Sequence, residues 1–93
     1  MKPVQVSARA YGDIRYLERW LADRAPEAAA EVGPMLFRAM KSLEQFPERG
    51  RPASGFRGRE LFVPFGNHGY VIRYRVHSDR VIIATVHHSL ERR

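Results

Sequence analysis

The second half of the chain alternates apolar and polar residues, and this period of two limits the fold more than any other feature. Between residues 60 and 88 the alternation is broken at two short segments, 66–69 and 78–80, which contain Gly, Asn, Ser and Asp. Such alternation is typical of strands with one buried face, and the interrupting residues favour turns. The sequence therefore predicts an antiparallel meander whose three strands span 60–65, 70–77 and 81–88.

Two stripes of apolar residues at helical spacing precede these strands. Ser7 suits the N-cap of the first helix, and Pro26 suits the first turn of the second. The first stripe consists of Ala10, Ile14, Leu17 and Leu21. The second consists of Ala28, Val32, Leu36, Ala39, Met40 and Leu43. Spacings of three and four place each stripe on one helix face, so a hairpin of two amphipathic helices is predicted.

The Gly33-Pro34 pair interrupts the second of these helices. An interior proline removes a backbone hydrogen bond and clashes with the preceding turn, so we expect a kink there or a restart at Pro34. A short alternating segment, Pro3–Val6, predicts one more strand at an edge of the sheet.

Helices followed by a run of strands predict an α+β domain. It has an N-terminal strand and an α-helical hairpin packed on one face of an antiparallel β-sheet, in the order β-α-α-β-β-β. In the middle strand, the residues expected to face the helices are Tyr70, Ile72, Tyr74 and Val76. Those expected on the open face are Arg73, Arg75 and His77. At 93 residues the chain fits one domain, expected to span 1–93.

Composition excludes several classes of protein. The chain contains no cysteine, which removes disulfides, thiolate nucleophiles and most structural zinc sites. The amino-terminal residues lack the apolar stretch of a signal peptide, and no window approaches the roughly 18 apolar residues of a membrane span. We therefore expect a cytoplasmic protein without a cofactor, a metal or a membrane partner.

The net charge of +6 is concentrated in one half of the chain. Residues 1–48 carry equal numbers of acidic and basic side chains, whereas residues 49–93 carry nine arginines against Glu60, Asp79 and Glu91. Arginine suits bidentate contacts with phosphates and carboxylates. An acidic partner is expected, either nucleic acid or an acidic protein, although an ordinary arginine-rich surface would give the same composition.

Arg73 and Arg75 form the most informative candidate site, because residues two apart on a strand point the same way. The residues expected to contact a target are Arg57, Arg59, Arg73, Arg75, Arg92 and Arg93. The alternative is a solvated face of a half-exposed sheet. Adjacent His87 and His88 point to opposite faces, so at most one can join the arginines, and His88 is the candidate general acid or base.

Three segments together resemble the RelE/ParE toxins. They read RELFVPF over 59–65, GYVIRYRV over 69–76 and VIIATVHH over 81–88, and the ParE branch is the nearer one. The resemblance implies the toxin of a type II toxin-antitoxin system, held inactive in a hetero-oligomer with a cognate acidic antitoxin. We expect the antitoxin contacts at Trp20, Leu21, Phe37 and Val71.

The family includes two modes of action. RelE-like members cut messenger RNA on the ribosome with basic side chains, and ParE-like members poison DNA gyrase. Where RelE-like nucleases carry basic residues, this chain has Phe62-Val63-Pro64, Val71 and Leu90. We therefore expect a gyrase inhibitor that is not an enzyme. If the chain is a ribonuclease, the catalytic residues are expected to be Arg73, Arg75, His88 and Arg92. A basic binding module without toxicity is the third alternative.

Overall fold

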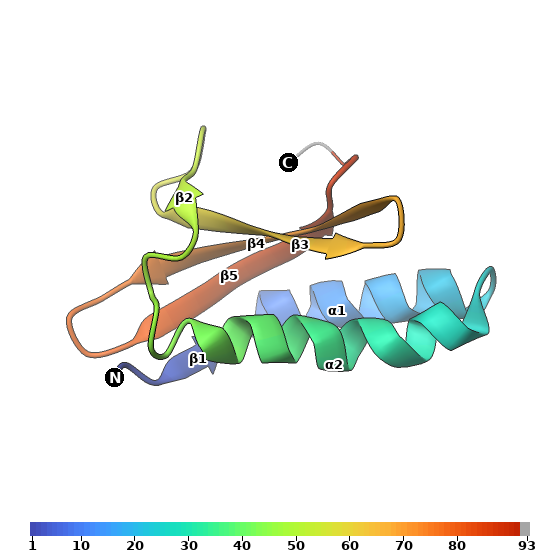
Figure 1. Ribbon diagram of the computed structural model, residues 1–93, viewed down its shortest axis with the longest axis horizontal. Coiled ribbons are helices and arrows are strands. Elements are labelled where there is room, and N and C mark those ends of the chain that lie inside the picture. Colours follow the sequence, from blue (N-terminus) through green and yellow to red (C-terminus); the bar gives the residue numbers. More distant parts are fainter. Residues whose placement is uncertain (92–93) are drawn as a thin grey trace.

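The computed structural model describes residues 1–91 as two helices beneath a five-stranded sheet (Figure 1). The elements are β1 (Val4–Val6), α1 (Ala8–Ala22), α2 (Pro26–Ser42), β2 (Arg51–Pro52), β3 (Arg59–Phe65), β4 (His68–Val76) and β5 (Val81–His88). The strand order is β1-β5-β4-β3-β2, with β1 parallel to β5 and every other pair antiparallel. The predicted α+β architecture is confirmed.

Three features of the sheet refine the sequence prediction. The first strand lies at the sheet edge, as expected. Sequence patterns do not predict β2, because two residues carry no periodicity. Val76 is exposed rather than in the core, because it lies at the very end of β4, although its partner Val81 is buried.

The two helices begin and run as their sequence dictates, with one exception. Ser7 caps α1 through its hydroxyl, which accepts a hydrogen bond from the Ala10 amide at 3.1 Å. Of the two outcomes expected at Pro34, the restart does not occur, because α2 is continuous from Pro26 to Ser42, and the kink stays a prediction. Val32 and Leu36, on either side of Pro34, are fully buried, and this burial favours the unbroken helix. Gly33 allows a close helix approach, since a Cβ there would lie 2.6 Å from the Glu18 carboxylate.

A one-residue bulge interrupts the pairing of β4 with β5. Arg73 pairs with Thr85, but the next residue, Tyr74, pairs with Ile83, so Ala84 is passed over. The amino-terminal part of the chain fixes this bulge. The Ser7 hydroxyl donates to the Ala84 carbonyl at 3.0 Å. After Ala84 the alternation of β5 is therefore reversed relative to the unbroken pattern.

Asp13 completes the anchoring of the bulge from α1. Its carboxylate accepts a hydrogen bond from the buried Val86 amide at 2.9 Å and one from the Arg9 guanidinium at 3.1 Å. The side chain is only 10% exposed. A carboxylate on the first helix thus holds the last strand in place.

Within residues 1–91, neither helix has the length and apolar content needed to cross a bilayer.

Candidate functional site

The face of the sheet away from the helices, here called the open face, carries Arg73 and Arg75. Their neighbours Ile72 and Tyr74 are fully buried against the helices, so the predicted shared face of the two arginines is confirmed. Only Arg75 is exposed. The Arg73 side chain is 16% exposed, and its Nε lies 3.5 Å from a Glu60 carboxylate oxygen. One of the two guanidinium groups is thus already engaged by an internal acid.

Phe56 covers both arginines from the loop that precedes β3. Its ring centroid lies 4.4 Å from the Arg75 guanidinium carbon and 5.6 Å from that of Arg73. These distances are within the range of cation–π contact. Gly55 and Gly58, which flank Phe56 with φ values of 72° and 152°, let the loop turn back onto the sheet. Those two glycines are the only sequence signal for this contact.

The other predicted target contacts do not join this pair. Arg59 pairs with Tyr74, which places it on the opposite face, and its guanidinium donates to the Gly50 carbonyl at 2.6 Å. Arg57 is exposed, and its carbonyl accepts a hydrogen bond from Arg75 Nε at 2.9 Å. Arg92 and Arg93 lie outside the described residues.

The expectation that His88 could act beside the two arginines is wrong, because the bulge at Ala84 exchanges the two histidines. His88 pairs with Tyr70 and therefore faces the helices, whereas His87 pairs with Val71 on the open face. His88 Nδ1 accepts a hydrogen bond from the Leu90 amide at 3.2 Å. His87 is 4% exposed. Strict alternation from Val81 onward would have given the opposite placement.

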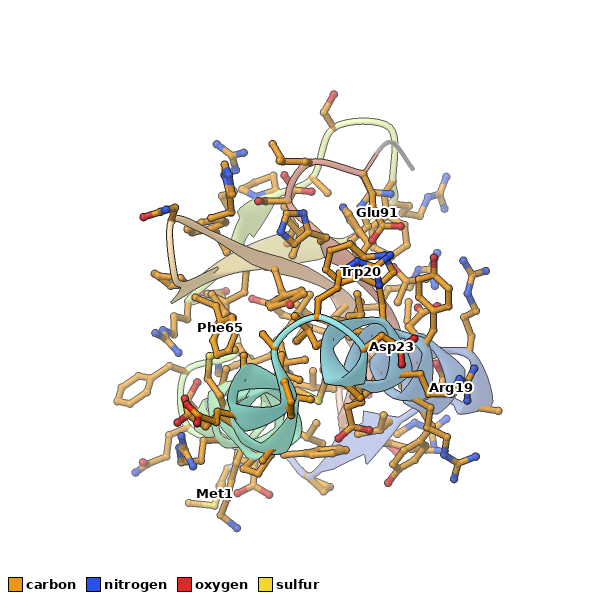
Figure 2. All side chains as sticks on the ribbon, turned by 90° about the vertical axis from the view of Figure 1, so that its right-hand side faces the viewer. Met1, Arg19, Trp20, Asp23, Phe65 and Glu91 are labelled. Atoms are coloured by element: carbon orange, nitrogen blue, oxygen red, sulfur yellow. The ribbon has the colours of Figure 1, made fainter. Side chains whose placement is uncertain are left out.

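The largely apolar groove on the helix-facing side is formed by α1, the β3–β4 turn and the end of β5. Its volume is about 420 Å³, and Trp20 and Leu21 contribute to its wall. Trp20 is 47% exposed, and the Arg24 guanidinium lies 4.0 Å from its ring. Figure 2 shows Trp20 directed from α1 toward Glu91, with Phe65 above α2. Two of the predicted antitoxin contacts thus share one groove.

The remaining two predicted antitoxin contacts lie elsewhere. Phe37 is exposed on α2, where its ring packs 5.9 Å from that of Tyr11 on α1. Val71 lies on the open face, in the wall of a second groove. The four residues therefore belong to three separate surfaces.

Among residues 1–91, no three His, Cys, Asp or Glu side chains gather in a way that could hold a metal ion.

Tyr74 ties the loop between α2 and β2 to the core. Its hydroxyl accepts a hydrogen bond from the Gly50 amide and donates one to the Pro47 carbonyl, both at 2.8 Å. Burial raises the pKa of this hydroxyl above its ordinary value of 10, although the hydrogen bond to Gly50 opposes the shift. The pKa of the Tyr70 hydroxyl is also raised, mainly by burial and to a smaller extent by the negative charge of Glu91.

These shifts predict a loss of stability in alkaline solution. Above about pH 10 the two tyrosines ionise in the unfolded chain but stay protonated in the folded one, so the unfolded state is favoured. We expect the free energy of unfolding in urea to fall between about pH 9 and pH 11. A flat profile over that range would contradict the assignment.

Comparison with known proteins gives the family. Residues 4–92 match the model of the ParE toxin of the type II toxin-antitoxin system parDE. The chain belongs to the ParE toxin family. It is 46% identical to Toxin RelE3 of Caulobacter vibrioides over all 93 residues, which cover 100% of both chains. Toxin RelE1 of the same organism is also 46% identical, and the match covers 97% of this chain and 96% of Toxin RelE1.

The fold of this ParE-family chain also matches a solved structure. A chain of the chromosomal ParDE system from P. aeruginosa superposes with a TM-score of 0.79, covering 95% of this chain and 96% of the other. The sequences are 21% identical, so this likeness concerns the fold. The resemblance to RelE/ParE toxins expected from the three strand segments is confirmed.

Proposed function

We propose that this chain is a toxin that inhibits DNA gyrase without catalysing a reaction, and that a cognate acidic antitoxin neutralises it. The choice of gyrase over messenger RNA as the target rests on the positions and contacts of the predicted catalytic residues. Arg73 is engaged by Glu60 and covered by Phe56, and His88 faces the helices. A ribonuclease needs its acid and base within hydrogen-bonding distance of the same ribose and phosphate. Arg75 and His88 are on opposite faces of the sheet.

Charge and exposed apolar surface support the antitoxin partner. The chain has a net charge of +6, which favours an acidic protein. Trp20 is a large aromatic residue exposed at the rim of an apolar groove, and such residues dominate binding energy in protein interfaces. The named relatives are toxins, and the similar fold comes from a ParDE system. We place part of the antitoxin interface at the groove that contains Trp20 and Leu21.

A supercoiling assay with purified gyrase tests the proposed target. We expect an excess of the chain to inhibit supercoiling, and Arg75→Ala to weaken inhibition by about tenfold, the effect of losing one charged hydrogen bond. Arg80→Ala is the matched control, because Arg80 is an exposed arginine in the β4–β5 turn. Full gyrase activity together with cut messages in a translating extract would establish the ribonuclease instead. Growth unharmed by expression would indicate a binding module.

A further inference from the structure

Arg75 carries an exposed guanidinium group that contacts a neighbouring loop in two ways. The loop spans residues 53–58, between β2 and β3, and Figure 1 shows it in yellow-green on the side of the sheet away from the helices. The Arg57 carbonyl accepts a hydrogen bond from Arg75 Nε at 2.9 Å, and the Phe56 ring centroid lies 4.4 Å from the guanidinium carbon. An exposed arginine near the end of β4 is therefore held at two points.

These two contacts leave the outer part of the Arg75 guanidinium available. The hydrogen bond uses Nε and the ring contact is made over the guanidinium carbon, so neither engages the two terminal amino groups. The terminal groups can make two parallel hydrogen bonds to a carboxylate or a phosphate. Arg75 can therefore remain attached to the loop while it contacts a target.

The loop is itself closed and packed against β4. The Ala53 amide donates a hydrogen bond to the Gly58 carbonyl at 3.0 Å, which joins the two ends of the loop. A Cβ at Gly58 would lie 2.5 Å from the Tyr74 carbonyl oxygen and 2.6 Å from the Phe56 ring. Because the Gly58 backbone lies this close to both groups, the loop holds Phe56 against the strand that carries Arg75.

Arg73 is held in a different way. The same ring lies 5.6 Å from its guanidinium carbon, but a Glu60 carboxylate oxygen also lies 3.5 Å from its Nε. The Arg73 side chain is only 16% exposed, whereas Arg75 has no carboxylate partner among residues 1–91. The internal acid thus neutralises Arg73, and the loop holds Arg75 with its charge uncompensated.

We propose that Phe56 is a positioning residue, whose ring acts with the Arg57 carbonyl to hold the Arg75 guanidinium in one orientation for a bidentate contact with the target. A mobile arginine side chain loses rotamer freedom when it binds, and one that is already held loses less. An aromatic ring suits this role, because the guanidinium group is planar and positively charged. The proposal rests on the proposed function, because it assumes that Arg75 contacts gyrase.

A double-mutant cycle in the supercoiling assay tests the proposal. Phe56→Ala should weaken inhibition by about fivefold, because Arg75 must then be immobilised on binding. In a chain that already carries Arg75→Ala, the same substitution should change inhibition by less than about twofold. In the matched Arg80→Ala background it should keep its effect of about fivefold. Phe56→Tyr retains the ring and should stay within about twofold of the unaltered chain.

Hydrogen exchange at the Arg75 Nε, followed by NMR, supplies a measurement that does not need gyrase. In the unaltered chain this hydrogen should exchange about tenfold more slowly than that of the exposed Arg80, and Phe56→Ala should remove most of the difference.

The two measurements separate the positioning role from the choice of target. If the unaltered chain inhibits gyrase while the losses from Phe56→Ala and Arg75→Ala combine to about fiftyfold, the positioning role is wrong and gyrase stands as the target. Equal exchange at Arg75 and Arg80 overturns the positioning role in the same way. If the unaltered chain does not inhibit gyrase, the proposed function fails, and hydrogen exchange alone decides whether Phe56 holds Arg75.

Discussion

Replacing Asp13 by alanine is expected to lower the free energy of unfolding by about 3 kcal/mol. The carboxylate accepts a hydrogen bond from the Val86 amide, and Val86 is fully buried. Alanine would leave that amide buried without this acceptor, and hydrogen bonds to charged groups are among the stronger ones in proteins. For a domain of this size the melting temperature should fall by roughly 15 °C, measured by thermal unfolding followed by circular dichroism.

Two further variants, one at Arg9 and one at Asp13, separate the hydrogen bond from the ion pair. Arg9→Ala removes the ion pair through its exposed partner, whose side chain is 61% exposed, so it should cost less than about 0.5 kcal/mol. Asp13→Asn keeps an acceptor for the Val86 amide and should cost less than Asp13→Ala. If Arg9→Ala proves as damaging as Asp13→Ala, the stabilisation comes from the ion pair, and the role given to Val86 is wrong.

Tyr74→Phe is expected to cost about 2 kcal/mol of stability, because it removes a single oxygen atom with two partners. The Gly50 amide and the Pro47 carbonyl both lose their bond to the Tyr74 hydroxyl. Gly50 is buried, so its amide cannot turn to water without movement of the loop. Equilibrium unfolding in urea measures the loss, and the alkaline decline in stability should become shallower in the same variant.

Tyr16→Phe is the matched control for this substitution. Tyr16 is 52% exposed on α1, so its variant should stay within about 0.5 kcal/mol of the unaltered protein. Equal stability of Tyr74→Phe and the unaltered chain would show that the Pro47–Gly50 loop is held by other contacts.

The sequence was sufficient for the helices and the three-stranded meander, because periodicity reports which residues face a core. The apolar stripe of α1 and the alternation around Ile72 both follow from burial that is local in sequence. β2 could not be predicted in the same way, since Arg51 and Pro52 pair with β3 through a contact made after a loop.

The candidate site was less predictable for a related reason. The sequence places Arg73 and Arg75 on one face, but it carries no sign that Glu60 lies opposite Arg73. The contact of Phe56 with both guanidinium groups depends on the path of a loop. Pairwise contacts between distant segments decide whether an arginine is available to a partner.

The bulge at Ala84 decides which histidine lies on each surface, although the composition of β5 is the same with or without it. Ala84 is the one residue of β5 that β4 passes over, so deleting it would leave an unbroken ladder with the imidazole of His87 still beside Val71. Closing the bulge at constant length would instead bring Ala84 into the ladder and exchange the faces of the two halves of the strand. The two histidines would then trade surfaces while both remain in the protein.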